Sequence, residues 1–252
     1  MDNALEVQKL CKTYGDFSLD SVSFSLPAGS VMGFAGQNGA GKTTTIRLIL
    51  NMAVRNSGGI KVFGLDNLSD ELAIKQELGA VFDDQFFVDT WRIREVEKVT
   101  KGFYRGWDSG IFCAYLEKFG LAPGKKVKEL SRGMKIKLML SVAMSHGAKL
   151  LILDEPTSGL DPVARNDLLD ILREYIADGE KSVFFSTHIT SDLERIADYI
   201  TLIDDGRIFY TGTKKGLFED FAAAKGGGVN LTEAPSIDEI LVYISKGGKL
   251  HE

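Results

Sequence analysis

The chain has 252 residues, enough to bury one substantial hydrophobic core, with 44% apolar and 26% charged residues, as in ordinary globular proteins. Its net charge of −5 argues against a general nucleic-acid binder, and two cysteines, too few for a disulfide framework, fit a reducing cytosol. The N-terminus lacks the apolar core of a signal peptide and no stretch approaches about 18 apolar residues, so a transport role would require another chain.

The N-terminal part carries strand patterns. In residues 21–26 the apolar Val22, Phe24 and Leu26 alternate with serines, which predicts a half-buried strand. Pro27, Ala28 and Gly29 form a turn signal, and the short apolar run 31–35 predicts a buried parallel strand.

A glycine-rich loop follows that run and matches the phosphate-binding pattern G-x-x-x-x-G-K-[ST]. It consists of Gly36, Gln37, Asn38, Gly39, Ala40, Gly41, Lys42 and Thr43, followed by Thr44 and a helical apolar pattern. The three glycines are expected to take left-handed backbone torsions that let successive N–H groups point at phosphate oxygens. The helix N-terminus adds positive charge, Lys42 reaches the β- and γ-phosphates, and Thr43 offers a hydroxyl to Mg²⁺.

The middle of the chain, about residues 85–147, is predicted to be helical. Asp108 is a candidate N-cap for a helix with Ile111, Phe112, Tyr115, Leu116 and Phe119 on one face. Ser131 is a candidate N-cap for a second helix over 132–145.

A second polar site is predicted after the buried strand 149–153. Asp154 and Glu155 stand at its carboxyl end, where open α/β sheets bind ligands. Asp154 is placed to hold Mg²⁺, usually through water, and Glu155 to polarise the attacking water. Further on, Asp161 predicts the N-cap of a helix, and the strand 182–186 ends just before His188, where a γ-phosphate contact would be needed.

The last third alternates strands and helices, as expected for a mostly parallel sheet. Residues 199–203 and 207–210 flank Asp204, Asp205 and Gly206, a strong hairpin signal. Residues 225–228 predict a flexible break, and 237–244 a short terminal helix.

Taken in order, these motifs resemble the nucleotide-binding subunits of ABC transporters, from about residue 5 to about residue 213. Residues 36–43 resemble the Walker A loop, 150–154 Walker B with Glu155 as catalytic glutamate, 158–161 the D-loop, and His188 the switch histidine. Residues 130–134 resemble the family signature, in which Ser131, Arg132, Gly133 and Met134 would contact nucleotide, as would Asp161 of the D-loop. Tyr14 lies where the family places an aromatic ring that stacks on adenine.

The resemblance implies an α/β fold of the P-loop NTPase type, with a mostly parallel sheet core, an N-terminal antiparallel β subdomain and an inserted α-helical subdomain. It divides the chain into an ABC ATPase domain, 1–220, with the helical subdomain at about 85–147, and a flexible segment with a short helix, 221–252. Lys42, Glu155 and His188 would be catalytic, and Thr43 and Asp154 would hold Mg²⁺.

The chain departs from the family pattern at two places. The signature, usually Leu-Ser-Gly-Gly-Gln, has Arg132 for a glycine and Met134 for the glutamine. The Q-loop glutamine is replaced in register by Asp83, and Gln85 stands two residues later; either is a candidate for Mg²⁺ or its water.

The function expected from the resemblance is hydrolysis of Mg·ATP in a head-to-tail dimer with a second copy or a paralogous ATPase subunit. It would drive transport, in the export direction, through a separate transmembrane permease at the cytoplasmic face of the membrane, without a nucleic-acid partner. The alternatives are a soluble or regulatory ABC-type ATPase not coupled to transport, and a P-loop kinase or GTP-binding switch. Chromosome- and repair-type relatives carry a long coiled coil between Walker A and the signature, for which 89 positions leave no room.

Overall fold

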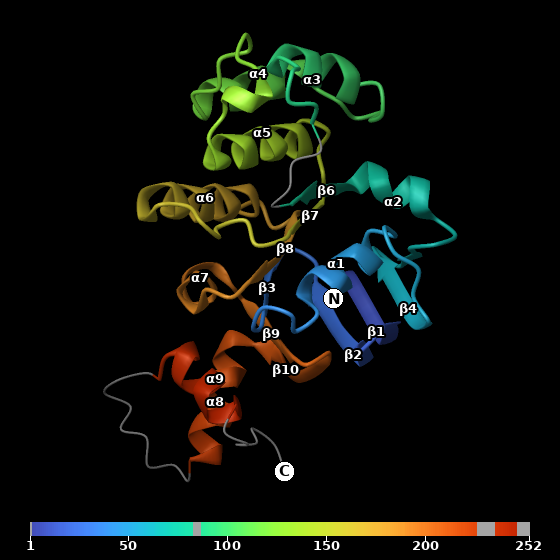
Figure 1. Ribbon diagram of the computed structural model, residues 1–252, viewed down its shortest axis with the longest axis vertical. Coiled ribbons are helices and arrows are strands. Elements are labelled where there is room, and N and C mark those ends of the chain that lie inside the picture. The colour runs from blue at the N-terminus through green and yellow to red at the C-terminus, as the bar shows by residue number, and fades with distance from the viewer. Residues whose placement is uncertain (1, 83–86, 226–234, 246–252) are drawn as a thin grey trace.

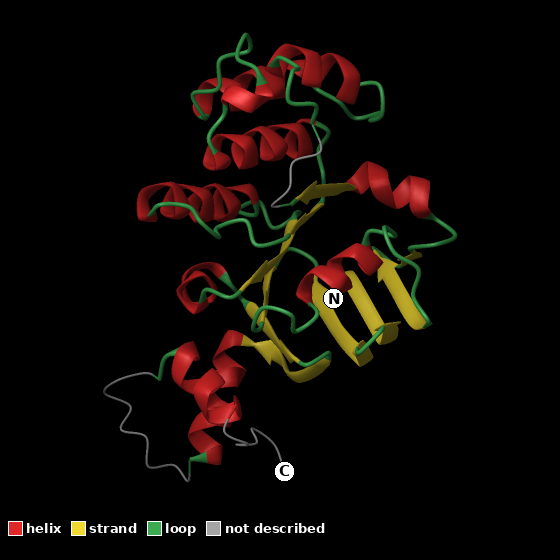
Figure 2. Ribbon diagram, in the orientation of Figure 1, coloured by secondary structure: helices red, strands yellow, loops and turns green. Residues whose placement is uncertain are grey.

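The computed structural model describes residues 2–82, 87–225 and 235–245, which build two β-sheets with helices around them (Figures 1 and 2). The smaller sheet is antiparallel and has the order β2-β1-β4-β5. Its strands are β1 (Asn3–Tyr14), β2 (Phe17–Pro27), β4 (Ser57–Val62) and β5 (Leu65–Asp66). Its inner face packs on the second sheet, where Phe24 lies against Phe34 and Phe184 with ring centroids 5.4 and 5.5 Å apart.

The larger sheet has six strands in the order β10-β9-β3-β8-β7-β6, of which only β10 is antiparallel to its neighbour. The strands are β3 (Val31–Ala35), β6 (Leu78–Val81), β7 (Leu150–Leu153), β8 (Ser182–Thr187), β9 (Tyr199–Asp204) and β10 (Arg207–Thr213). β3, β7 and β8 are buried along their whole length, as expected for central parallel strands. The predicted strand 31–35 and the hairpin over 199–210 are confirmed.

The carboxyl ends of β3, β7 and β8 lead directly into the polar segments of interest. β3 runs into the glycine loop and helix α1 (Lys42–Ile49), β7 into Asp154 and Glu155, and β8 into His188. Because neighbouring parallel strands end at the same edge of a sheet, this topology brings the three segments together.

The helices lie beside the larger sheet and form both ends of the molecule's long axis (Figure 1). Besides α1 they are α2 (Glu71–Glu77), α3 (Ile93–Thr100), α4 (Ser109–Lys118), the 3₁₀ turn η1 (Val127–Glu129), α5 (Arg132–Ser145), α6 (Pro162–Tyr175), α7 (Thr190–Ile196), α8 (Lys214–Ala224) and α9 (Ile237–Ser245). α8 crosses the predicted boundary at residue 220, and the predicted break extends into residues outside the described part.

Helices α3, α4 and α5 form a helical region at one end of the molecule, within the range 85–147 (Figure 2). Asp108 caps α4 by accepting hydrogen bonds from the N–H groups of Gly110 and Ile111, as predicted. Phe112 and Leu116 are buried, but Ile111 is 43% exposed. Ile111, in the turn that Asp108 caps, is thus the one exposed residue of the predicted apolar face.

Helix α5 is the link between the helical region and the larger sheet. It contacts β6 on one side and α4 on the other, and all its residues from Leu138 to Ser145 are buried. At its C-terminal end the His146 ring stacks on Tyr104 with centroids 3.8 Å apart. Burial lowers the pKa of His146 to about 4, so this contact is made by a neutral ring at neutral pH.

Candidate active site

The glycine loop has the backbone geometry of a phosphate cradle. Gly41 has a φ of +112° and a Cβ there would lie 2.6 Å from the Leu19 side chain, so only glycine fits directly before α1. Gly39 is also left-handed, with a φ of +86°. Gly36 is not, which corrects the expectation; it is required because a Cβ would lie 2.1 Å from the Ile203 carbonyl oxygen.

The loop is open at its tip and closed at its base. Gln37, Asn38 and Gly39 are exposed, whereas Ala40, Gly41 and Lys42 are buried. Helix α1 begins at Lys42 with no side-chain cap, so the N–H groups of its first turn are available to an anion. Thr43 and Thr44, in that turn, are half-buried.

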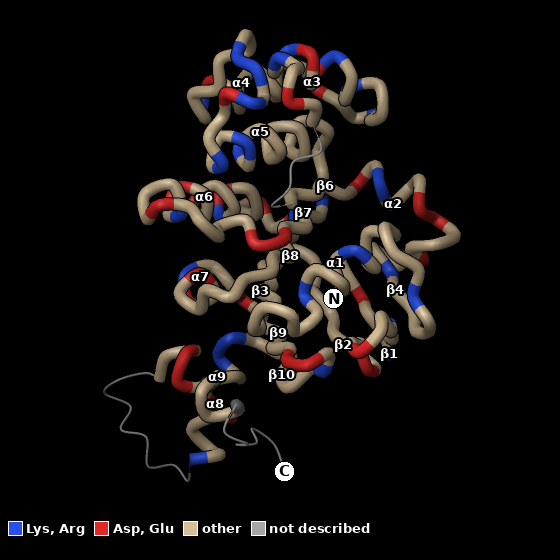
Figure 3. Tube along the Cα trace, viewed as in Figure 1, with Lys and Arg blue, Asp and Glu red and all other residues tan. Residues whose placement is uncertain are grey.

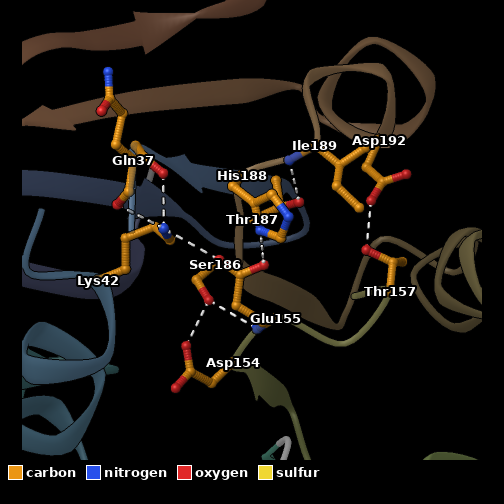
Figure 4. A network of polar contacts seen from close by, with 11 residues as sticks. Gln37, Lys42, Asp154, Glu155, Thr157, Ser186, Thr187, His188, Ile189 and Asp192 are labelled. Atoms are coloured by element: carbon orange, nitrogen blue, oxygen red, sulfur yellow. Dashed lines mark hydrogen bonds and ion pairs between the residues drawn. The ribbon is translucent and has the colours of Figure 1, made fainter. Parts of the chain in front are cut away.

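Lys42 is the centre of the polar network drawn in Figure 4. Its ammonium group donates to the carbonyl oxygens of Gly36, at 2.7 Å, and Gln37, at 3.1 Å. It also lies 3.1 Å from Oε1 of Glu155, although the two residues are far apart in the sequence. The side chain is 6% exposed, so its charge is held in place by three oxygens at the mouth of the loop.

Glu155 joins Lys42 to His188. Its Oε2 lies 2.7 Å from Nδ1 of His188, so one carboxylate contacts both groups (Figure 4). Glu155 takes a φ of +49°, a left-handed torsion that is rare for a residue with a side chain. Such strain persists only where the surroundings enforce it, and it is concentrated at functional sites.

Ser186 is the residue that enforces this geometry, and the sequence reasoning missed it. Its hydroxyl donates to Oδ1 of Asp154 at 2.7 Å and accepts the backbone N–H of Glu155 at 2.9 Å. Ser186 is fully buried and Asp154 is 6% exposed. One serine on β8 therefore orients both acidic residues that follow β7. The only signal for it in the sequence was its place two residues before His188.

A second pair of contacts ties the residues on either side of the D-loop to Asp192 of α7, the helix after His188. Thr157 donates to Oδ2 of Asp192 at 2.6 Å, and Arg165 Nε donates to the other oxygen at 2.6 Å. Asp192 is fully buried, so its charge is balanced by Arg165. Asp161 caps α6 through the N–H groups of Val163 and Ala164, as predicted.

The signature segment lies away from the glycine loop of the same chain. Ser131 caps α5 by accepting the N–H of Met134 at 3.3 Å, as predicted. A Cβ at Gly133 would lie 3.5 Å from Leu160 of the D-loop and 3.9 Å from Ala164 of α6. The guanidinium of Arg132 lies on the D-loop, where a Cβ at Gly159 would be 2.7 Å from its Nη1. Figure 1 shows α5 and α1 well apart, so one chain does not bring signature and glycine loop together.

Tyr14, the predicted adenine-stacking residue, lies at the edge of the site. Tyr14 ends β1, is 48% exposed and pairs in register with Phe17, whose ring would lie 3.0 Å from a Cβ at Gly41. Lys12 Nζ lies 4.5 Å from the Tyr14 ring centroid. Asp83 and Gln85, the two Q-loop candidates, lie outside the described residues.

The donor set suits a magnesium ion bound together with phosphates rather than alone. Within the described residues no group of three or more His, Cys, Asp or Glu side chains is placed to hold a metal ion. Thr43 and the buried carboxylate of Asp154 are hard oxygen ligands, which Mg²⁺ accepts alongside substrate phosphates and water. The glycine loop, the Lys42 ammonium group and the carboxylates of Asp154 and Glu155 together define a phosphate-loop nucleotide hydrolase on an α/β sheet.

The comparisons with known proteins narrow that class to one family. The profile of the family described as ABC transporter matches residues 19–158, more than half of the chain. The chain belongs to the ABC transporter family, and it is an ATP-binding subunit of the type that hydrolyses ATP.

Three relatives illustrate the likeness. The bacitracin transport ATP-binding protein BcrA of Bacillus licheniformis is 31% identical over 211 residues, covering 82% of this chain and 69% of that protein. The Nod factor export ATP-binding protein I of Neorhizobium galegae is 34% identical over 237 residues, covering 86% of this chain and 64% of that protein. The lantibiotic transport ATP-binding protein SrtF of Streptococcus pyogenes is 32% identical over 207 residues, covering 81% of this chain and 88% of that protein.

The fold is also that of solved family members. A structure described as the ATP binding subunit of an ABC transporter superposes with a TM-score of 0.83 at 26% identity, covering 96% of this chain and 99% of that one. The α/β P-loop fold with its two sheets is thereby confirmed. Among the described residues, no helix has both the length and the apolar character needed to cross a bilayer.

Proposed function

We propose that this chain hydrolyses Mg·ATP in a head-to-tail pair and drives export through a separate permease. The observation that carries the proposal is the division of the site. Lys42, Asp154, Glu155 and His188 converge in one chain, whereas Ser131 and its helix lie elsewhere. In a pair related by a two-fold axis, the signature of each copy would face the glycine loop of the other copy.

Within one chain the residues have separable roles. The loop N–H groups and Lys42 would bind the phosphates, and Thr43 and Asp154 would hold Mg²⁺, which supplies charge neutralisation at the transferred phosphoryl group. Glu155 would accept a proton from the attacking water. Lys42 and Glu155 form an ion pair at 3.1 Å. Phosphates that attract the Lys42 ammonium group would therefore free the Glu155 carboxylate to accept the proton of the attacking water.

His188 and Ser186 would position that carboxylate. His188 Nδ1 lies 2.7 Å from Oε2 of Glu155, and Ser186 holds the backbone and the neighbouring Asp154. The buried hydrogen bonds of Asp192 to Thr157 and Arg165, on either side of the D-loop, would fix the position of the D-loop relative to His188. A contact of the partner chain with the D-loop would then also shift His188.

The permease is proposed to dock in an apolar groove of about 340 Å³ beside α2. Leu50, Met52, Ile74, Leu78 and Phe82 line it, with Tyr104 on the side of the helical region. An amphipathic helix is the occupant that suits it, because such a helix covers a groove of this kind with one apolar face. The three relatives named above are ATP-binding proteins of transport or export systems, which supports both the permease and the export direction.

The head-to-tail arrangement is testable by trapping mixed dimers. Lys42→Ala and Ser131→Glu are each introduced into a Glu155→Gln background that binds ATP without hydrolysing it. Neither variant should form ATP-dependent dimers alone, since each loses one half of both sites. Mixed, they retain one intact composite site, so ATP should allow a tag on one variant to capture the other.

The controls decide between this proposal and its alternatives. Glu155→Gln alone should dimerise with ATP and not with ADP, and GTP in its place tests the nucleotide preference. If the mixture forms no more ATP-dependent dimer than the separate variants, head-to-tail completion of the site is wrong.

A further inference from the structure

Charge is segregated along this chain, and most of the basic segment lies outside the nucleotide site. Residues 91–137 carry 12 Lys and Arg but only 5 Asp and Glu, a net charge of +7, whereas the whole chain has −5. The rest of the protein therefore has −12. Figure 3 shows Lys and Arg gathered around α3 and α4, with acidic segments on α6, the β9–β10 turn and the C-terminal helices.

Helix α3 arranges part of this charge on one face. Arg94, Lys98 and Lys101 follow one another at intervals of four and three residues, which places them on one side of the helix. Ile93 and Val96 are buried on the other side. The exposed Lys125 is brought to the start of the helix, because Ile93 N–H donates to its carbonyl oxygen at 3.0 Å.

The acidic residues of the same region are mostly used for capping. Glu95 accepts the N–H of Arg92 at 2.6 Å, Glu129 accepts that of Lys126 at 2.7 Å, and Asp108 caps α4. The exposed Lys118 of this region pairs with Glu174 at 2.6 Å, but six other exposed cations of the region make no ion pair or side-chain hydrogen bond with a described residue. We call them the basic face: Arg94, Lys98, Lys101, Arg105, Lys125 and Lys128.

Two large apolar side chains are exposed next to the basic face. Phe103 is 71% exposed and Leu72 is 83% exposed, and both line one shallow groove with Arg105. They are held together by Gln76 of α2, which donates to the Phe103 carbonyl oxygen at 3.0 Å and accepts the Arg105 N–H at 2.9 Å.

We propose that the basic face, with Phe103 and Leu72, binds the surface of a bilayer that contains anionic lipids. Cations interleaved with exposed apolar side chains are the composition that suits a headgroup layer, where charge meets phosphate and the apolar group enters the acyl boundary. Each Lys or Arg near an anionic surface contributes about fivefold in partitioning at physiological salt.

The position of the face agrees with this partner. Tyr104 lines both the groove of Phe103 and the apolar groove beside α2. If the proposed permease docks in the latter, the bilayer lies on the same side as the basic face. That orientation rests on the proposed function, but lipid binding itself rests on the charge and exposure of the face.

The test is sedimentation of the purified full chain with vesicles. We expect binding to vesicles of phosphatidylcholine with about 30% phosphatidylglycerol, weak binding to pure phosphatidylcholine, and release at high salt. The triple variant Lys98→Glu, Lys101→Glu, Arg105→Glu should lower partitioning at least about 100-fold. Phe103→Ser should weaken binding while leaving its salt dependence intact.

A matched control makes the same change of charge elsewhere. Lys61, Arg173 and Lys215 are exposed on β4, α6 and α8, and replacing all three with Glu should leave vesicle binding within a few fold of wild type. Equal loss in both triple variants would show a mere net-charge effect and overturn the proposal. So would tighter binding of a DNA duplex than of anionic vesicles, with the same dependence on the basic face.

The outcome is separable from that of the proposed function. ATP-dependent dimers can be measured without lipid, and the first triple variant should form them normally. Vesicle binding without dimers would leave this inference standing and remove the other.

Discussion

The two halves of the nucleotide site are built in different ways. The half with the glycine loop is held by polar contacts among buried groups, with Lys42, Glu155, His188, Ser186 and Asp154 joined in one network. The signature half rests on apolar packing of α5, and Ser131 caps the start of that helix. The comparison indicates that the contacts of the glycine-loop half are already formed within one chain. The signature half is instead a surface that a second chain would contact.

The largest effect is expected from removing the charge of Glu155. Glu155→Gln should lower kcat by about 10²–10⁴-fold, because an amide cannot accept the proton of the attacking water. ATP binding should survive, since Lys42 keeps its two backbone partners. Steady-state ATPase assays and equilibrium binding measure the two quantities separately, and normal turnover would remove Glu155 from catalysis.

A smaller loss is expected when the serine beneath both carboxylates is removed. Ser186→Ala deletes a hydrogen bond to buried Asp154 and one to the N–H of Glu155, so kcat should fall about 10–100-fold. The Mg²⁺ concentration for half-maximal activity should rise as well, which a purely structural role would not cause. Ser186→Thr retains the hydroxyl and should restore part of the activity.

Ser182 provides the control on the same strand. It is also fully buried, and its hydroxyl accepts the N–H of Gly29 at 3.0 Å, away from the carboxylates. Ser182→Ala should destabilise the fold to a similar degree without changing the Mg²⁺ dependence. If both variants behave alike, Ser186 is structural and the network does not position the acids.

The third prediction concerns the attachment of the signature half to the core. Burial lowers the pKa of His146 to about 4 from an ordinary value of 6.5. His146 therefore binds a proton more readily in the unfolded chain than in the folded one. Its contribution to the free energy of unfolding is fully present above pH 6.5 and is lost as the pH falls towards 4. By pH 5 the loss from this one group should reach about 2 kcal/mol.

Thermal unfolding at pH 7 and pH 5 measures this loss against a variant that cannot titrate. His146→Phe retains a ring to stack on Tyr104 but has no proton to bind. The difference in Tm between the two pH values should be smaller in the variant than in the wild type. Equal shifts in both proteins would show that other groups, such as the carboxylates, carry the acid sensitivity.

The difference between the halves also explains what the sequence could predict. Local rules located the Walker A loop, the caps Asp108, Ser131 and Asp161, and the alternation of strands and helices, since each depends on neighbouring residues. The sequence did not reveal Ser186 as the partner of Asp154, because 32 positions separate them and only the register of β7 and β8 brings them together. Gly36 was predicted to need a left-handed torsion, but a distant carbonyl oxygen, that of Ile203, is what requires a glycine there.

The smallest effect is expected at the signature itself, and it tests whether that surface is used. Ser131→Ala removes the cap of α5, which should lower stability by about 1 kcal/mol. Asp108→Ala removes the cap of α4 in the same helical region and should lower stability by a similar amount.

The two variants should differ in ATP-dependent dimerisation. Only Ser131 carries a hydroxyl that the proposed pairing presents to the partner's nucleotide, so only its loss should raise, about fivefold, the ATP concentration needed for dimerisation. Light scattering of both variants in the Glu155→Gln background, titrated with ATP, measures this. Equal ATP requirements would mean that Ser131 serves its helix alone, and that the second half of the site is presented by some other part of the surface.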